Sequence, residues 1–335
     1  MAKNKPSINP QAAIPDIESK KIQVADYNSI QAKVANVLGT SLSSNATFGW
    51  GQTIQSSPVS VSTKVGVSDW NKLKFDIINA WTHIYNTTPP LVTATQNNIV
   101  RGDTETSPYS QYDGYADSIV AGRFTVSPSQ ALTLPAQSEQ TTWPGTYGTT
   151  WKTRLYATVS VSWPTAAEAR HFFNSGGEIR FASSRSGGGT VGQIAVQNAS
   201  WTNLLSSAGT QGFGGNIPSA GVSPTDGKNF YRLTNVFQIW YQKTASSPYA
   251  LNKYRLSART PSVANNSTGT ASTIEFQIEW LDDHVPQGTS TADNVDGTIT
   301  LEVSGIKAVG TFFPSGAGNF TITSPTITIT QAPRP

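Results

Sequence analysis

Residues 26–39 and 68–86 each carry an apolar stripe with a spacing of three or four, which is typical of an amphipathic helix. The first stripe consists of Tyr27, Ile30, Val34 and Val37. The second consists of Trp70, Leu73, Ile77, Trp81 and Ile84. Asp26 and Ser68 stand where helix N-caps are expected. We therefore predict two helices in a helical attachment region that spans 23–90.

Two helices of this size cannot bury so many aromatic rings against each other alone. Part of their apolar surface must therefore pack on the rest of the protein or on another chain. The residues that we expect in oligomer or attachment contacts are Tyr27, Ile30, Trp70, Ile77 and Trp81. Pro6, Pro10 and Pro15 interrupt residues 1–22. Because proline disfavours helices and strand ladders, we predict an extended arm that lies on a neighbouring subunit.

The pattern changes to strands in the second half of the chain, where short apolar segments alternate with turn residues. The clearest strand is 273–280, because every second residue is apolar. Its predicted buried face consists of Ile274, Phe276, Ile278 and Trp280. Such alternation indicates an antiparallel strand with one buried face. Many short strands in series predict a jelly-roll-like antiparallel β-sandwich over 151–335.

Residues 91–150 show a weaker pattern that is rich in Tyr, Ser, Thr, Gln and Pro. We predict a loop-rich connecting region there, with one strand over 118–127. The expected fold class is therefore α+β and mainly β. The arm and the small helical region precede the connecting region, and the β domain over 151–335 carries short inserted helices.

The segment TAAEARHFFNSGG begins at Thr165, which forms a capping box with Glu168 and starts a short helix. Gly176 or Gly177 ends that helix in the left-handed conformation, and a strand follows. The next stretch, SRSGGG at 184–189, has the composition of a phosphate-binding loop. However, it lacks the G-x-x-x-x-G-K-[ST] pattern and does not clearly open a helix. We interpret it as a mobile loop that meets a neighbouring subunit.

Composition excludes several classes of function. Only 13% of the residues are charged and the net charge is +3, so no basic stripe predicts a nucleic-acid partner. The chain has no Cys, which excludes disulfides and thiolate metal sites and allows maturation in a reducing cytosol. We find no apolar run that reaches the roughly 18 residues of a membrane span and no signal region, and expect neither export nor membrane insertion.

Candidate catalytic and metal-binding groups are few. Four carboxylates near His284 form a weak Ca²⁺ candidate without the spacing of a calcium-binding loop. They are Asp282, Asp283, Asp293 and Asp296. Glu275 and Glu279 suggest a glycosidase, but one strand places them roughly 13 Å apart, which is too far for either mechanism. Lys253 or Arg255 on a neighbouring strand is the simpler partner, so we expect no enzyme, no metal and no cofactor.

Aromatic side chains in the connecting region allow a second interpretation. Amphipathic rings in loops stack on sugars, although they also serve as subunit contacts. The candidates for glycan stacking are Tyr109, Trp143, Tyr147 and Trp151. A receptor- or glycan-binding module of a tail fibre or baseplate is therefore the alternative function, and a host surface glycan is its expected partner.

Three stretches carry a resemblance to a known family. They are the Tyr-Asn-x-Ile helix DYNSIQAKVANVLG, the segment GWGQTIQSSPVSVSTKVGVSDWNKLKFDIINAW, and HFFNSGGEIRFASSRSGG with NASWTNLLSSAG. In this order they resemble virion structural proteins of tailed cyanophages of the myovirus type. The resemblance covers about half of the chain, at 26–86 and 154–215, whereas 216–335 carries no such signature.

The resemblance implies a non-enzymatic building block of a virion that assembles in the host bacterial cytoplasm. It implies partners among other virion proteins and copies of the same chain in a symmetric homo-oligomer. An arm, a helical attachment region and a β domain favour a neck, collar, tail or fibre subunit. No catalytic residues come with the resemblance.

Overall fold

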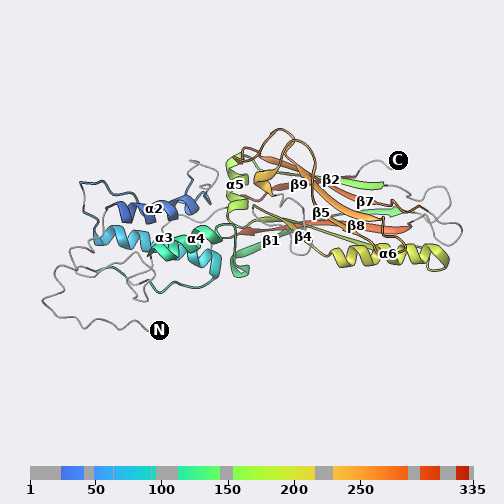
Figure 1. Cartoon of the computed structure of the whole chain (residues 1–335), viewed down its shortest axis with the longest axis horizontal. Coiled ribbons are helices and arrows are strands. Elements are labelled where there is room, and N and C mark those ends of the chain that lie inside the picture. Colours follow the sequence, from blue (N-terminus) through green and yellow to red (C-terminus); the bar gives the residue numbers. More distant parts are fainter. Residues whose placement is uncertain are drawn as a thin grey trace.

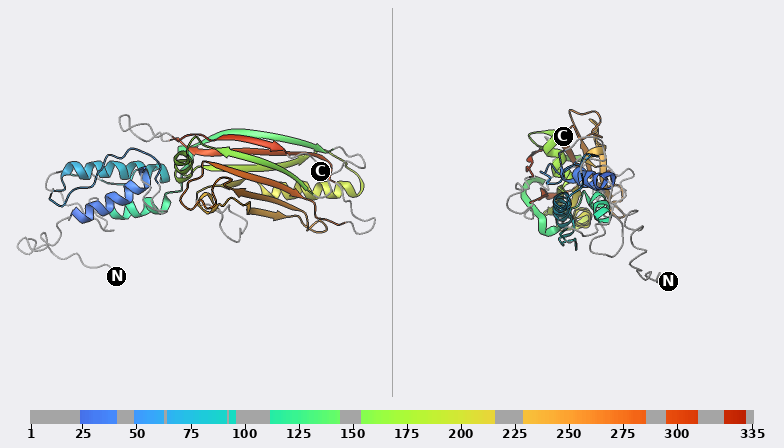
Figure 2. Two further views of the ribbon diagram at one scale, coloured as in Figure 1. Left: turned by 90° about the horizontal axis from the view of Figure 1, so that it is seen from above. Right: turned by 90° about the vertical axis from the view of Figure 1, so that its left-hand side faces the viewer.

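The protein is elongated, with a helical region at one end of its long axis and a β-sandwich at the other (Figures 1 and 2). The computed structural model describes residues 24–40, 49–62, 64–91, 93–95, 112–143, 154–215, 229–285, 295–309 and 322–331. The predicted arm at 1–22 lies outside these described residues. The predicted fold class, α+β and mainly β, is confirmed.

In the described part of the N-terminal region there are three helices, namely α2 (Val24–Leu38), α3 (Val67–Tyr85) and α4 (Tyr112–Gly122). The first two match the predicted helices to within a few residues. Their aromatic rings meet edge to face, with Tyr27 and Trp70 5.2 Å apart and Trp70 and Tyr112 4.9 Å apart between ring centroids. The third helix therefore supplies part of the cover that two helices alone lack.

The predicted strand at 118–127 is wrong, because α4 occupies its first half, 118–122, and 123–127 are a turn and irregular backbone. Tyr112, Ala116 and Ile119 are buried at helical spacing on one face of α4. Packing of this face against α2 and α3 overrides the local strand propensity of Ile119 and Val120. The connecting region also contains a long strand that the sequence analysis missed, β1 (Ala131–Trp143).

The helix starts differ from the prediction in detail. Helix α2 begins at Val24, so Asp26 lies in its first turn and not at the N-cap. The N-cap of α3 is Gly66, and its N–H donates to the Asp69 carboxylate at 2.9 Å. Ser68 lies inside the helix. The carboxylates of Asp26 and Asp69 still stabilise their helices, because the N-terminal turn of a helix attracts negative charge.

Two antiparallel sheets form the sandwich. The four-stranded sheet has the order β1-β8-β3-β4, with β8 (Gly297–Ala308), β3 (Glu178–Ser186) and β4 (Gln211–Phe213). The five-stranded sheet has the order β5-β6-β7-β2-β9, with β5 (Gln238–Thr244), β6 (Lys253–Arg259), β7 (Thr273–Leu281), β2 (Arg154–Ser162) and β9 (Thr326–Gln331). The strand orders β1-β8-β3 and β2-β7 are those of a jelly roll. Strands β5, β6 and β7 instead form a simple meander.

Aromatic rings from both sheets fill the core of the sandwich. Phe181 of β3 lies 4.7 Å from Phe276 of β7, and Phe213 of β4 lies 5.4 Å from Trp240 of β5, between ring centroids. The predicted buried face of β7 is confirmed, since Ile274, Phe276, Ile278 and Trp280 are all buried. The two inner faces therefore interdigitate as in other sandwiches.

Two helices complete the β domain. Helix α5 (Ala166–Asn174) begins at the predicted N-cap, where the Glu168 N–H donates to the Thr165 hydroxyl at 3.2 Å. Gly176 has a positive φ of 90°, as the predicted left-handed stop requires. Helix α6 (Gly192–Ala208) follows the glycine-rich loop and runs along the side of the sandwich (Figure 1). The expectation that no helix opens after SRSGGG is therefore wrong.

Candidate functional site

A buried joint connects the helical region to the sandwich, and Trp50 lies at its centre. The Trp50 side chain is fully buried, and its indole N–H lies 2.9 Å from the Arg123 carbonyl oxygen and 2.7 Å from that of Asn174. Its ring packs against the His83 ring at 4.1 Å between centroids, with the two planes tilted by 39°. One side chain therefore links the end of α4, helix α3 and the end of α5.

Asn174 holds the other side of this joint. Its amide N–H donates to the Gly49 carbonyl at 3.1 Å, and its amide oxygen accepts a hydrogen bond from the Tyr231 hydroxyl. Gly51, next to Trp50, has a φ of +74°, and a Cβ there would lie 2.4 Å from the His171 ring. Only glycine fits this position without strain.

The joint unites two segments that lie far apart in the sequence. The turn G-W-G-Q at 49–52 hydrogen-bonds to the C-terminal end of α2, with Trp50 N–H 2.8 Å from the Val37 carbonyl. The same turn packs against the corner F-F-N-S-G-G-E at 172–178, where α5 ends and β3 begins. The stretch HFFNSGG therefore holds the two halves of the molecule together.

Positive and titratable groups surround the joint. A ring N–H of His83 donates to the Ser175 carbonyl at 2.8 Å, and complete burial lowers the His83 pKa to about 4. Burial also lowers the pKa of His171, Arg123 and Arg170, and both guanidinium groups lie near the Tyr231 phenol. Protonating His83 therefore adds a cation to a site that already contains buried cations.

Acidification should loosen this joint. The His83 pKa falls from 6.5 when unfolded to about 4 when folded, so its contribution to stability is complete above pH 6.5 and declines as the pH drops toward 4. We expect the free energy of unfolding to fall by about 2 kcal/mol between pH 7.5 and pH 5 from this group. Urea unfolding at both pH values measures the change. The variant His83→Gln retains an N–H donor but does not titrate, so its free energy of unfolding should lack this part of the pH dependence. If the variant showed the same pH dependence as the original protein, His83 would not be its source.

A second buried cluster joins the glycine-rich loop to the start of β8. The Arg185 guanidinium and the Asp296 carboxylate are nearly buried, with 3% and 6% of their side chains exposed, and lie 3.4 Å apart. The Gly189 N–H donates to the same carboxylate at 2.9 Å, and the Asn198 amide also donates to it. The stretch SRSGGG, which has the composition of a phosphate-binding loop, thus binds an anion. That anion is the Asp296 carboxylate of the chain itself. This part of the loop is fixed within the subunit.

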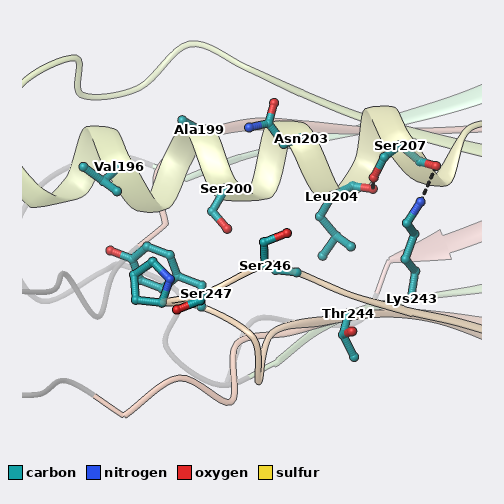
Figure 3. A pocket seen from close by; sticks show the side chains of 13 residues that line it. Val196, Ala199, Ser200, Asn203, Leu204, Ser207, Lys243, Thr244, Ser246 and Ser247 are labelled. Atoms are coloured by element: carbon teal, nitrogen blue, oxygen red, sulfur yellow. Dashed lines mark hydrogen bonds between the residues drawn. The ribbon is translucent and has the colours of Figure 1, made fainter.

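A groove lies between α6 and the residues that follow β5, at the end of the sandwich away from the helical region (Figures 1 and 3). It has a volume of about 460 Å³. Most of its lining side chains are small or polar, including Ala199, Ser200, Asn203, Thr244 and Ser246. The ammonium group of Lys243 donates to the Ser207 carbonyl and closes one end of the groove (Figure 3).

The residues predicted for attachment are mostly core residues. Tyr27, Ile30, Trp70 and Ile77 are no more than 5% exposed, so they pack inside the helical region and present no surface to another subunit. Trp81 is partly buried between Tyr85 and Tyr115. Helix α4 and the joint cover the other four side chains within the chain, whereas an intermolecular role of the partly buried Trp81 stays a prediction.

The structure does not gather the predicted calcium ligands. Asp282 accepts hydrogen bonds from the Gln197 amide, Asp283 pairs with Lys253 at 2.8 Å, and Asp296 belongs to the Arg185 cluster. Asp293 lies outside the described residues. Within the described part of the chain, no three His, Asp or Glu side chains are arranged to hold a metal ion.

The paired glutamates of β7 have arginine partners. Glu275 lies 2.6 Å from Arg259, and Glu279 lies 2.6 Å from Arg154 and 3.6 Å from Arg255. Arg255 on the neighbouring strand is the predicted partner of Glu279, whereas Lys253 pairs elsewhere. These arginines neutralise both carboxylates.

The predicted glycan-stacking residues cannot be placed. Tyr109, Tyr147 and Trp151 lie outside the described residues, and only the backbone of Trp143, at the end of β1, is described. Sequence reasoning missed the groove, because its two walls come from segments about forty residues apart with no shared motif. None of the described helices has the length and apolar character needed to cross a membrane.

The fold and the site together define a two-sheet α+β protein with a helical region fixed to one end. No protein-family model matches the chain, and neither a curated protein nor a solved structure does.

Proposed function

We propose that the chain is a non-enzymatic structural subunit of a tailed-phage virion, in the neck, collar, tail or fibre, that assembles with copies of itself. The observation that carries this proposal is the joint. Two motifs of the resemblance, G-W-G-Q and F-F-N-S-G-G-E, lie far apart in sequence and pack on each other there. Sequence motifs that are shared because they maintain a fold are expected to meet in a structural contact of this kind.

The shape and stiffness of the molecule also support a structural role. A projecting subunit must keep its two ends in a fixed relation while force acts along its length. The joint provides several buried hydrogen bonds and aromatic contacts between the two halves, as Trp50 and Asn174 illustrate. Buried and satisfied polar networks of this kind favour one rigid arrangement.

The mass of the purified protein in solution, measured by light scattering at several concentrations, tests the proposal. We expect a closed oligomer such as a trimer or a hexamer, because most homo-oligomers have closed symmetry. Tyr27, Trp70 and Ile77 are buried in each subunit, so contacts must use other surfaces. A monodisperse monomer at every concentration would contradict self-assembly.

A further inference from the structure

Among the described strands, the outer edge of β5 has no partner, and the last two residues of this strand, Lys243 and Thr244, line the groove. β5 is a terminal strand of the five-stranded sheet and pairs with β6 on one side only. The Ala245 N–H donates to the Asn252 carbonyl at 2.9 Å, so Ala245 faces β6. Because antiparallel pairs alternate, the N–H and C=O of Thr244 point away from β6. Thr244 also lines the groove.

The opposite wall of the groove suits an extended chain. Helix α6 lines the groove with Ala199, Ser200, Asn203 and Leu204, of which Ser200 and Leu204 point toward the facing wall in Figure 3. A strand placed between a sheet edge and a helix gains backbone hydrogen bonds from the edge and side-chain contacts from the helix, as in strand-addition complexes. The groove therefore favours a polypeptide in extended conformation.

We infer that the groove binds the N-terminal arm, residues 1–23, of a second copy of the chain. This inference rests on the proposed self-assembly. Between Pro10 and Pro15, residues 11–14 (Gln-Ala-Ala-Ile) keep all their N–H donors, and two of the four are alanine. Asp16 follows directly and complements the Lys243 ammonium in charge.

The position of the arm favours a second copy over the same one. The described chain begins at Val24 in the helical region, at the end of the molecule that lies opposite the groove (Figure 1). Twenty-three extended residues reach at most about 75 Å. To fill its own groove, an arm would have to run back along the whole sandwich, whereas the arm of an adjacent copy can enter directly.

Disulfide trapping tests the inference with high specificity, because the full chain has no Cys of its own. Ala13→Cys in one chain and Ala199→Cys in a second, longer tagged chain are co-expressed and mildly oxidised. We expect a disulfide-linked heterodimer on non-reducing gels, about tenfold above a control pair, because bound segments meet at effective concentrations near mM. The control replaces Ala199→Cys by Val61→Cys, which lies in the helical region and is 92% exposed.

A charge exchange tests the register of the arm. Asp16→Lys should reduce the cross-linked fraction severalfold, and Lys243→Glu in the tagged chain should restore it. Glu18→Lys is the matched control and should leave the cross-link nearly unchanged. The charge exchange can restore the cross-linked fraction only if positions 16 and 243 meet. If it does not, the proposed register of the arm is wrong, and so is the arm as the occupant of the groove.

The outcomes separate this inference from the proposed function. A closed oligomer in light scattering, with cross-links at Ala199→Cys no stronger than at Val61→Cys, would overturn the inference and leave the structural role standing. A monomer at every concentration without cross-links would overturn both. Saturable binding of a sugar that Ala199→Trp abolishes would show that a glycan, and not the arm, occupies the groove.

Discussion

Replacing Trp50 by alanine should lower the free energy of unfolding by about 3–5 kcal/mol, the range expected when a fully buried large aromatic side chain is removed. The substitution removes a ring that is completely buried and packs against His83. It also leaves the carbonyls of Arg123 and Asn174 without their indole donor. Urea unfolding followed by circular dichroism at pH 7.5 measures the loss.

Two further variants separate the parts of this effect. Trp50→Phe keeps a ring and loses only the N–H, so it should cost about 1–3 kcal/mol, because two buried carbonyl groups lose a hydrogen-bond donor. Trp81→Ala removes a partly buried indole outside the joint and should cost less than Trp50→Ala. Small-angle X-ray scattering should show a less rigid molecule for Trp50→Ala only. A loss below about 1 kcal/mol for Trp50→Ala would mean that the joint contributes little.

Local sequence patterns predicted those elements in which large apolar side chains recur at a regular spacing on the buried face. Helices α2 and α3 and strand β7 belong to this class, because a stripe of large apolar side chains at regular spacing marks each of them, although α3 also buries Asp76, Asn79 and His83. In helix α6 the buried apolar side chains are confined to the second half, at Trp201, Leu204, Leu205 and Ala208. Its first half buries Gln197 and Asn198, whose amides hydrogen-bond to Asp282 and Asp296. Polar residues with such partners give no apolar signal in the sequence.

Contacts between distant segments explain the other differences. The helical region does not expose its aromatic stripe, because α4 and the G-W-G-Q turn cover it, and neither was predicted to do so. Arg185 and Asp296 are 111 residues apart, so no spacing rule brings them together. The composition of SRSGGG is that of an anion-binding loop, but the sequence analysis rejected an anion site there because the phosphate-loop spacing is missing. That the anion comes from within the chain is a property of the folded topology.

The buried pair of Arg185 and Asp296 should be the second large contributor to stability. Removing one partner of a buried ion pair costs about 3–5 kcal/mol, because the other charge remains desolvated and uncompensated. We therefore expect Asp296→Asn, which keeps the shape of the side chain, to lower the free energy of unfolding by this amount. Thermal and urea unfolding at pH 7.5 measure it. Asp283→Asn, at a pair in which 45% of the carboxylate side chain is exposed, should change stability by less than about 1 kcal/mol.

A double-mutant cycle distinguishes loss of the pair from damage to the loop. Arg185→Met removes the cation and alone should also destabilise the protein, since the Asp296 carboxylate then keeps only the Gly189 N–H and the Asn198 amide. The double variant Arg185→Met/Asp296→Asn buries no charge at all. It should therefore lose about 1–3 kcal/mol less than the sum of the single variants, which is the coupling expected for residues in direct contact. Strict additivity would mean that the loop is held by the hydrogen bonds of Gly189 and Asn198, and that the ion pair adds nothing to them.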